Sequence, residues 1–284
     1  MAARIRPASQ DDVPWISEWT ADTFEWGDYV PERLPQWLAE PDSAVLVTVD
    51  ADDRPTAVAH VLMLSPTEGW LEGARVHPDH RRGGLGSALN RAGVEWAAER
   101  GARVVRLATE GANVGARSQV EALGYREVSR WIHAELEVPP HLVASDRSRL
   151  RPAPSSDAEA AWLFWVASDL AREGRELIGH GWRWRSARPA DVTELGELHQ
   201  SPAGWLALDQ PADDWIRVHW MVTTPEDILM LLDGLVALAS ERGVTDLDVM
   251  LPELPWTTEA MRRSGAEPAT MVVYAKAVKG GSGE

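Results

Sequence analysis

The sequence predicts an α/β protein built from two copies of one unit. Short apolar runs rich in β-branched residues alternate with segments whose apolar residues recur every three to four positions. Two stretches of the second half, 239–249 and 265–275, parallel 97–107 and 124–134 of the first. A chain of 284 residues is also long enough to bury two cores of ordinary size. We therefore expect each half to fold as a domain of its own.

The first half begins with a short strand and a helix start in residues 5–12, a pattern that residues 150–157 repeat. Residues 24–35 mix aromatic and acidic side chains with Gly and Pro, so we expect a loop and a short helix there. The apolar runs 44–50 and 56–63 flank a polar turn and predict a β-hairpin.

Residues 69–76 predict the central strand of this half. Alternation along a strand predicts that every second side chain shares one face, which here groups Trp70, Glu72, Ala74 and Val76. A bulge before Val76 would change that register. The strand leads into a glycine-rich turn, and apolar residues at helical spacing then continue until Gly101.

The remainder of the first half predicts a buried strand at 104–108, a helix at 114–123 and a further strand at 126–136. Prolines and polar residues without apolar periodicity follow and indicate a linker. The expected organisation is a first domain, a linker, a second domain and a flexible tail, over residues 1–140, 141–148, 149–278 and 279–284 respectively.

Composition narrows the classes of function. A net charge of −16 argues against nucleic acid as a partner and favours a cationic acceptor such as an amine. Without cysteine the chain has no disulfide, no thiolate metal site and no cysteine nucleophile. No apolar run is long enough to cross a membrane, and the first residues lack the apolar core of a signal peptide, so we expect a cytoplasmic protein without membrane contact.

The stretch 76–89 predicts a cradle for pyrophosphate. Glycines at 83, 84 and 86 allow a turn whose N–H groups point into one concavity, and a helix opens directly behind them. Arg81 and Arg82 add positive charge. The two glycine-rich fingerprints of nucleotide-binding folds do not fit, because no Lys-Ser/Thr follows and the third glycine of the dinucleotide pattern is missing.

The spacing of Arg81, Gly84 and Gly86 resembles the acetyl-CoA loop of GNAT-type N-acetyltransferases. A strand before the loop, a helix after it, and Asn113-x-x-Ala116 further along the chain agree with that resemblance. It implies a mixed, mostly antiparallel sheet flanked by helices in each half, with acetyl-CoA as co-substrate. The cofactor-binding residues that it implies are Ala74, Arg75, Val76, Arg81, Arg82, Gly83, Gly84, Leu85, Gly86, Ser87 and Asn113.

The second half lacks this loop. Residues 223–228 replace it with a shorter segment that contains no Gly or Arg and carries Glu226 and Asp227. A phosphate there would meet carboxylates, so we expect a degenerate second domain that does not bind the cofactor.

The resemblance implies that Glu72 acts as general base, because many family members carry a carboxylate four residues before the position of Val76. A strand glutamate that faces solvent or pairs with an arginine is the alternative. The tyrosine that often serves as general acid is replaced by Val120, and Ser118 and Tyr125 are the candidate substitutes. A thiol leaves readily as thiolate, so an acid is dispensable. Asn113 either contacts the pantetheine arm or caps a helix.

In this family the segment between the first two helices helps to cover the acceptor. The acidic and aromatic residues of that segment here, which would suit an amine with some apolar bulk, are Glu25, Trp26, Asp28 and Tyr29. A helix pair that only packs on the sheet explains the same composition. His77 and His80 have no further ligand nearby, so no metal site is expected.

The sequence thus predicts an acetyl-CoA-dependent N-acetyltransferase that acts on the primary amine of a small molecule, with a second domain that shapes the acceptor cleft or the surface of a homodimer. Two alternatives stay open. One is a protein or peptide N-acetyltransferase, which would need an open groove, and the other is a non-enzymatic scaffold that binds acyl-CoA.

Overall fold

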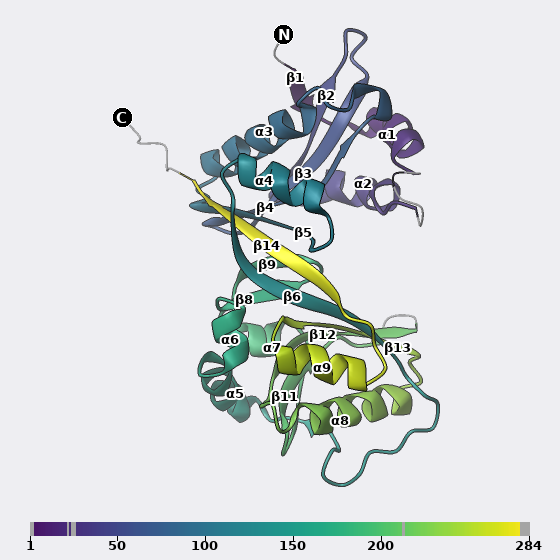
Figure 1. Ribbon diagram of the computed structural model, residues 1–284, viewed down its shortest axis with the longest axis vertical. Coiled ribbons are helices and arrows are strands. Elements are labelled where there is room, and N and C mark those ends of the chain that lie inside the picture. Colours follow the sequence, from purple (N-terminus) through teal and green to yellow (C-terminus); the bar gives the residue numbers. More distant parts are fainter. Residues whose placement is uncertain (1–2, 22, 24–26, 212–213, 279–284) are drawn as a thin grey trace. The chain divides into compact units, whose positions relative to one another are not determined.

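The computed structural model describes residues 3–21, 23, 27–211 and 214–278. The chain divides into two compact units. The first contains residues 1–107, 118–126 and 274–284, and the second contains residues 108–117 and 127–273. Both are helix-flanked sheets with mostly antiparallel strands (Figure 1). None of the helices in the described ranges is long and apolar enough to span a membrane.

The first unit has four antiparallel strands in sequence order, and the last of them pairs in parallel with β5. Its elements are β1 (Arg4–Pro7), a 3₁₀ turn (Gln10–Asp12), α1 (Val13–Thr20), α2 (Val30–Ala39), β2 (Ser43–Val49), β3 (Pro55–Ser65), β4 (Glu68–Val76), a 3₁₀ turn (Pro78–His80), α3 (Leu85–Glu99) and β5 (Val104–Glu110). α4 (Val114–Ala122) and β6 (Arg126–Glu137) follow and contribute residues to both units.

Helices cover both faces of this sheet (Figure 1). On one face Ile16 of α1 and Leu34 and Trp37 of α2 pack with the valines of β2 and Val58 of β3. On the other face α3 approaches so closely that a Cβ on Gly93 would lie 3.0 Å from Leu71. The expected hairpin, central strand and following helix are all present.

A bulge in β4 sets which of its side chains share a face. Val58 of β3 pairs with Arg75, and His60 pairs with Glu72. One residue separates these pairs on β3 and two separate them on β4, which defines a β-bulge. Glu72 therefore shares a face with Arg75. The unbroken alternation that would place Glu72 beside Val76 is wrong for this strand, and the alternative register with a bulge is the one observed.

The second unit repeats the core order of three antiparallel strands, a helix, a parallel strand and a second helix. Its elements are β7 (Arg151–Pro152), a 3₁₀ turn (Ser155–Asp157), α5 (Ala158–Val166), α6 (Asp169–Glu173), β8 (Leu177–His180), β9 (Arg183–Ser186), α7 (Asp191–Glu194), β10 (Glu197–Ser201), β11 (Gly204–Leu208), β12 (Trp215–Val222), α8 (Ile228–Glu241), β13 (Asp246–Pro252), α9 (Pro255–Arg263) and β14 (Ala269–Ala277). β8 and β9 form a separate hairpin.

The repeat extends to backbone detail. β12 also carries a bulge, because Trp220 and Val218 pair with adjacent residues of β11 and leave His219 between them. His219 stands three residues before Val222, the last residue of β12, just as Gly73 stands before the last residue of β4. The bulge is thus a property of the shared fold.

Each unit includes a closing strand from the other half of the sequence. Residues 127–137 of β6 belong to the second unit, where residues 131–137 pair with β13. Residues 274–277 of β14 belong to the first unit, where Tyr274 donates a hydrogen bond to Glu121. A boundary drawn from the sequence repeat alone does not reveal this exchange.

Candidate active site

The glycine-rich loop leads from β4 into α3 within the first unit. Its backbone passes through the left-handed region at Arg82, with φ of 65°, and at Gly84, with φ of 75°. A Cβ on Gly84 would meet nothing within 4 Å, so conformation selects glycine there. A Cβ on Gly86 would lie 3.2 Å from Nε2 of Gln119 and 3.6 Å from Cγ2 of Val76, so close packing selects glycine at that position.

The loop presents a row of backbone donors. α3 begins at Leu85, and the backbone N–H of Ala88 donates a hydrogen bond to the carbonyl oxygen of Gly84 at 3.0 Å. Within the part of the chain that the structure describes, the N–H groups of residues 82–87 have no recorded protein acceptor. Arg81 and Arg82 are exposed beside them. Donors at a helix N-terminus flanked by guanidinium groups bind anions, so these residues fit the pyrophosphate of acetyl-CoA.

His77 anchors the start of the loop to the rest of the unit. Its backbone N–H donates to Thr56 O at 2.9 Å. Its ring stacks on Trp15 of α1, with 6.0 Å between centroids and 9° between planes, and lies 5.5 Å from the ring of Trp19. Trp15 is itself held by a hydrogen bond from Nε1 to Pro55 O at 2.9 Å. The histidine that the sequence offered as a solvated loop residue therefore packs between two tryptophans.

Glu72 is held by two side-chain donors. Its Oε1 lies 2.9 Å from Nδ1 of His60, and its Oε2 accepts a hydrogen bond from Nε1 of Trp70 at 3.0 Å. The carboxylate is 15% exposed and the His60 ring is fully buried. Glu72 is thus a half-buried carboxylate with a fixed orientation, which is the state that a general base requires.

The bulge residue Gly73 brings a tryptophan onto this cluster. A Cβ on Gly73 would lie 2.3 Å from Cη2 of Trp37, so only glycine leaves room for that ring. Trp37 in turn stacks on His60, with 4.8 Å between centroids and 14° between planes. The sequence permits this arrangement because Gly73 also adopts a positive φ of 65°.

Tyr29 and Asp28 lie on the same face of the unit as Glu72. Asp28 forms a bidentate pair with Arg75, at 2.5 Å from Nε and 3.0 Å from NH2, and its side chain is fully buried. Tyr29 is half-exposed, with its ring 5.2 Å below the Arg75 guanidinium and edge-on to Trp37. Burial of the hydroxyl raises the pKa of Tyr29, Arg75 opposes the rise, and the charge of Glu72 adds to it.

These contacts distinguish between the residues that the sequence proposed for binding the acceptor. The ring of Tyr29 is half-exposed, whereas the carboxylate of Asp28 is already neutralised by Arg75. The two remaining candidates, Glu25 and Trp26, lie outside the described residues. Arg75 was expected to contribute its backbone, and its guanidinium is engaged away from the loop.

The candidates for general acid differ in exposure. Ser118 is exposed on α4. Tyr125 is fully buried, and this burial raises its pKa to about 12, which favours a packing role. Asn113 accepts a hydrogen bond from Ala116 N at 3.0 Å and so caps α4. No group of three or more potential ligands for a metal ion occurs among the described residues.

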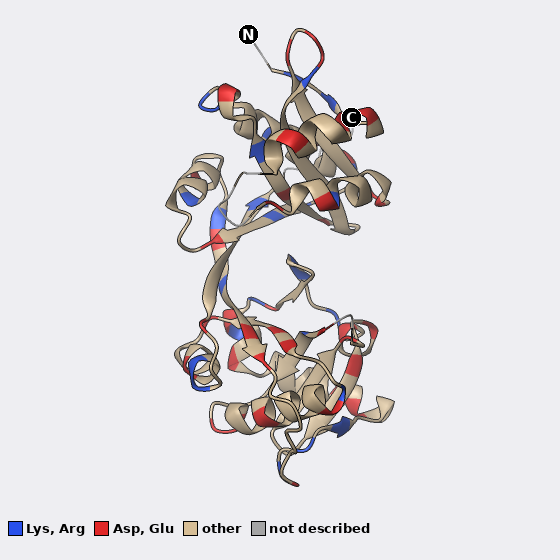
Figure 2. Ribbon diagram, turned by 90° about the vertical axis from the view of Figure 1, so that its right-hand side faces the viewer, with Lys and Arg blue, Asp and Glu red and all other residues tan. Residues whose placement is uncertain are grey.

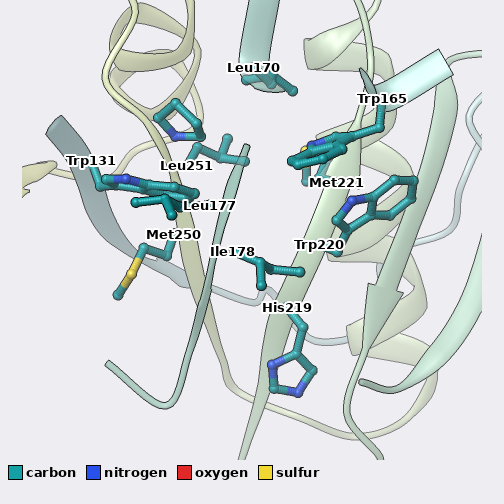
Figure 3. Close-up of a pocket in the computed structure, with 11 residues that line it drawn as sticks. Trp131, Trp165, Leu170, Leu177, Ile178, His219, Trp220, Met221, Met250 and Leu251 are labelled. Atoms are coloured by element: carbon teal, nitrogen blue, oxygen red, sulfur yellow. The ribbon is translucent and has the colours of Figure 1, made fainter. Parts of the chain in front are cut away.

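The second unit differs at the corresponding place. β12 pairs with β13 from Trp215 to Val218 and then diverges from it. The gap between the diverging strands is filled by large side chains, and a cavity of about 20 Å³ remains, with room for about one water molecule. Figure 3 shows residues that line it, which include Trp131, Trp165, Ile178, His219, Trp220, Met221, Met250 and Leu251.

The segment before α8 also differs from the glycine-rich loop, because it carries carboxylates and contains no Gly or Arg. α8 begins after Asp227, whose carboxylate accepts a hydrogen bond from Thr224 Oγ1 at 3.1 Å, and Glu226 is exposed nearby. Acidic positions are prominent over the helices of this unit (Figure 2). Both the filled gap and the acidic turn thus differ from the glycine-rich loop of the first unit.

Comparison with known families agrees with the geometry of the first unit. Residues 14–125, which contain strands β2 to β5, the loop and α3, match the model of the acetyltransferase (GNAT) family. This part of the chain is thus similar to the GNAT family of N-acetyltransferases. Members of this family use acetyl-CoA and act on amines, which agrees with the resemblance in the loop sequence.

Two curated GNAT relatives cover different shares of the chain. A mycothiol acetyltransferase of Mycolicibacterium gilvum is 29% identical over 208 residues, which are 70% of this chain and 64% of the relative. An aminoglycoside N(6')-acetyltransferase type 1 of Stenotrophomonas maltophilia is 27% identical over 147 residues, which are 49% of this chain and 96% of the relative.

Solved structures show the same GNAT fold over nearly the whole chain. A GCN5-related N-acetyltransferase of Sphaerobacter thermophilus aligns with a TM-score of 0.65 and 19% identity, over 96% of this chain and 95% of its own. A GCN5-related N-acetyltransferase of Kribbella flavida aligns with a TM-score of 0.53 and 15% identity, over 96% of this chain and 71% of its own. These alignments confirm the fold class predicted from the sequence.

Sequence reasoning missed His60. It lies in the strand 56–63, where a single polar residue interrupts an apolar run, and that interruption was the available signal. A lone buried histidine is more often a packing residue, and its pairing with Glu72 depends on the register of β3 against the bulged β4.

Proposed function

We propose that this protein transfers an acetyl group from acetyl-CoA to the primary amine of a small molecule. The observation that carries the proposal is the bulged end of β4. The bulge turns Glu72 toward the α2 face beside Tyr29, while Val76 packs against Gly86 at the start of the loop helix. A base and an anion cradle are thereby joined by one strand.

In this proposal acetyl-CoA supplies an acetyl group activated as a thioester. The N–H groups of residues 82–87, with Arg81 and Arg82, hold its phosphates. Glu72 accepts the proton of the arriving ammonium, because an amine with a pKa near ~10 is mostly protonated at neutral pH. The backbone N–H groups near Arg75 and Val76 polarise the reacting carbonyl, as the family resemblance implies.

The acceptor is proposed to be a small amine for two reasons. The half-exposed ring of Tyr29 and the carboxylate of Glu72 together suit a cation with some apolar surface. The net charge of −16 also favours the approach of cations. The two relatives are named for mycothiol and for aminoglycosides, which are small molecules, and neither is assigned to this chain.

One molecule of acetyl-CoA is proposed to bind per chain, since only the first unit has the glycine-rich loop and the gap in the second unit is filled. Calorimetry with acetyl-CoA should give one equivalent. Arg81→Glu with Gly84→Asp should abolish the binding in a folded protein. Two equivalents, or binding that survives the double substitution, would reassign the cofactor site.

Release of free thiol from acetyl-CoA tests the proposed function, measured across a panel of small amines, aminoglycosides and peptides. Turnover with small amines supports the proposal, and turnover with peptides alone would identify a protein or peptide acetyltransferase. Binding of acetyl-CoA without turnover on any amine would identify a scaffold. The expected homodimer is still a prediction that light scattering can check.

A further inference from the structure

His60 and Glu72 are directly opposite each other on β3 and β4, in the register that the bulge creates. A carboxylate oxygen can only accept a hydrogen bond, so His60 Nδ1 carries the hydrogen whenever Glu72 is ionised. Trp70 donates to the second oxygen of the same carboxylate. Among the described residues, His60 and Trp70 thus each donate to one oxygen of Glu72.

The far side of the His60 ring is also constrained. Nε2 faces Oε2 of Glu40 at 3.8 Å, and among the described residues it has no hydrogen-bond partner. Trp37 covers the ring face. The buried imidazole has a single available orientation, because carboxylates face both of its nitrogens and a tryptophan covers its ring face. Its hydrogen bond therefore fixes the direction of the Glu72 carboxylate.

We propose that His60 is the positioning residue of Glu72, which keeps this carboxylate ionised and fixes its direction. The proposal rests on the proposed function in that it treats Glu72 as the base. Hydrogen bonds to the charged form of an acid favour that form, whereas burial favours the neutral one. Without His60, a carboxylate that is 15% exposed would hold its proton at a higher pH.

The other charged and titratable groups near Glu72 do not replace this contribution. Glu40 is an acid and favours the neutral form of Glu72. Tyr29 is influenced by the charges of Glu72, Arg75 and Asp28 together. Arg75 is the nearby cation, and its guanidinium is held by the buried carboxylate of Asp28. Among these groups, His60 is the one that donates a hydrogen bond to Glu72, so its removal should change the ionisation of that carboxylate.

The indole N–H of Trp70 offers a readout that is independent of turnover. Because it donates to Glu72 at 3.0 Å, its NMR resonance should shift when that carboxylate gains a proton. The resonance is assigned with Trp70→Phe and followed against pH in the parent without acetyl-CoA. Glu72→Gln should abolish the titration, which shows that the signal reports Glu72.

Two substitutions of His60 then test the proposal. His60→Leu should raise the midpoint of the Trp70 titration by about one pH unit or more, since hydrogen bonds to charged groups contribute on that scale. His60→Asn keeps an N–H near the position of Nδ1, so it should raise the midpoint of the Trp70 titration by less than half of the increase caused by His60→Leu. His133→Leu, which removes a histidine bound to Asp248, is the matched control and should leave the midpoint unchanged.

An unchanged midpoint in His60→Leu would overturn the proposal. If that variant does not fold, His60→Gln, whose N–H lies near the position of Nε2, takes its place in the comparison with His60→Asn, and equal midpoints for these two would also overturn it. The acid limb of kcat/KM should move with the NMR midpoint. No turnover by the parent on any amine would refute the proposed function and leave the NMR result to decide the role of His60 alone.

Discussion

Replacement of Gly73 by alanine tests whether the bulge and the tryptophan beside it determine the geometry around Glu72. At a φ of 65°, an L-residue incurs roughly 1–2 kcal/mol of strain. The new Cβ would also lie 2.3 Å from Cη2 and 2.8 Å from Cζ3 of Trp37, contacts that the fully stacked ring cannot relieve by a small rotation. Overpacking of this kind costs about 1–3 kcal/mol. The expected loss of unfolding free energy is therefore about 2–5 kcal/mol.

Gly84→Ala is the matched control for this substitution. Gly84 has a similar φ of 75°, but a Cβ there meets nothing within 4 Å. It should carry the conformational cost alone, about 1–2 kcal/mol. Urea unfolding followed by tryptophan fluorescence measures both variants, and the difference between them isolates the contact with Trp37.

A second substitution localises the effect further. Trp37→Leu removes the ring that the new methyl group meets, so Gly73→Ala should cost less in that background than in the parent, by an amount similar to the overpacking estimate of about 1–3 kcal/mol. The reasoning is refuted if Gly73→Ala destabilises no more than Gly84→Ala, or if its cost is the same with and without Trp37.

Three further substitutions test other parts of the structure. Arg106→Met should cost about 3–5 kcal/mol of unfolding free energy because it removes the guanidinium that lies 2.5 Å from the largely buried carboxylate of Glu68. Glu68→Gln in the same chain should recover much of that loss, and recovery of less than a few tenths of a kcal/mol would contradict the ion-pair argument. His77→Ala should weaken acetyl-CoA binding by tenfold or more, because it releases the loop from Trp15, while the midpoint of urea unfolding should stay nearly unchanged. An unchanged dissociation constant for acetyl-CoA would show that the stacking does not hold the loop in its binding conformation. Burial, with a further contribution from His219, lowers the pKa of His180 from 6.5 to about 4. Between these pH values the unfolded chain binds a proton that the folded chain does not, so the unfolding free energy of the second unit should fall as the pH drops from 6.5 to 4. His180→Gln should make the unfolding free energy depend less on pH over this range.

The cofactor loop could be predicted from sequence because its information is local. Arg81, Gly84 and Gly86 lie within six residues, and glycine adopts the positive φ of position 84 without steric cost. The flanking strand and helix follow from periodicity over short windows. The structure formed by such local patterns can be predicted from the sequence because it does not depend on contacts with residues far away in the chain.

The arrangement around Glu72 could not be predicted in the same way. Its side chain direction depends on a bulge, and its partner His60 is set by the register between two strands. Arg75 and Asp28 are 47 residues apart, so their pairing is invisible to any local pattern. Tyr125 follows a helix-ending glycine, where sequence alone allows either a reactive or a packed ring, and only the tertiary structure shows it fully buried.

The kinetics of Glu72→Gln test the central claim most directly. The substitution keeps the shape of the side chain, so acetyl-CoA affinity by calorimetry should match the parent. The unfolding midpoint should fall, because one of the two donors His60 and Trp70 then meets an amide N–H in place of a carboxylate oxygen. The rate constant kcat on a responsive amine at pH 7 should fall by about 10²- to 10⁴-fold, the usual contribution of a general base, and the loss should shrink at high pH, where the amine arrives neutral. Turnover within about threefold of the parent at pH 7 would contradict the assignment of Glu72 as the base.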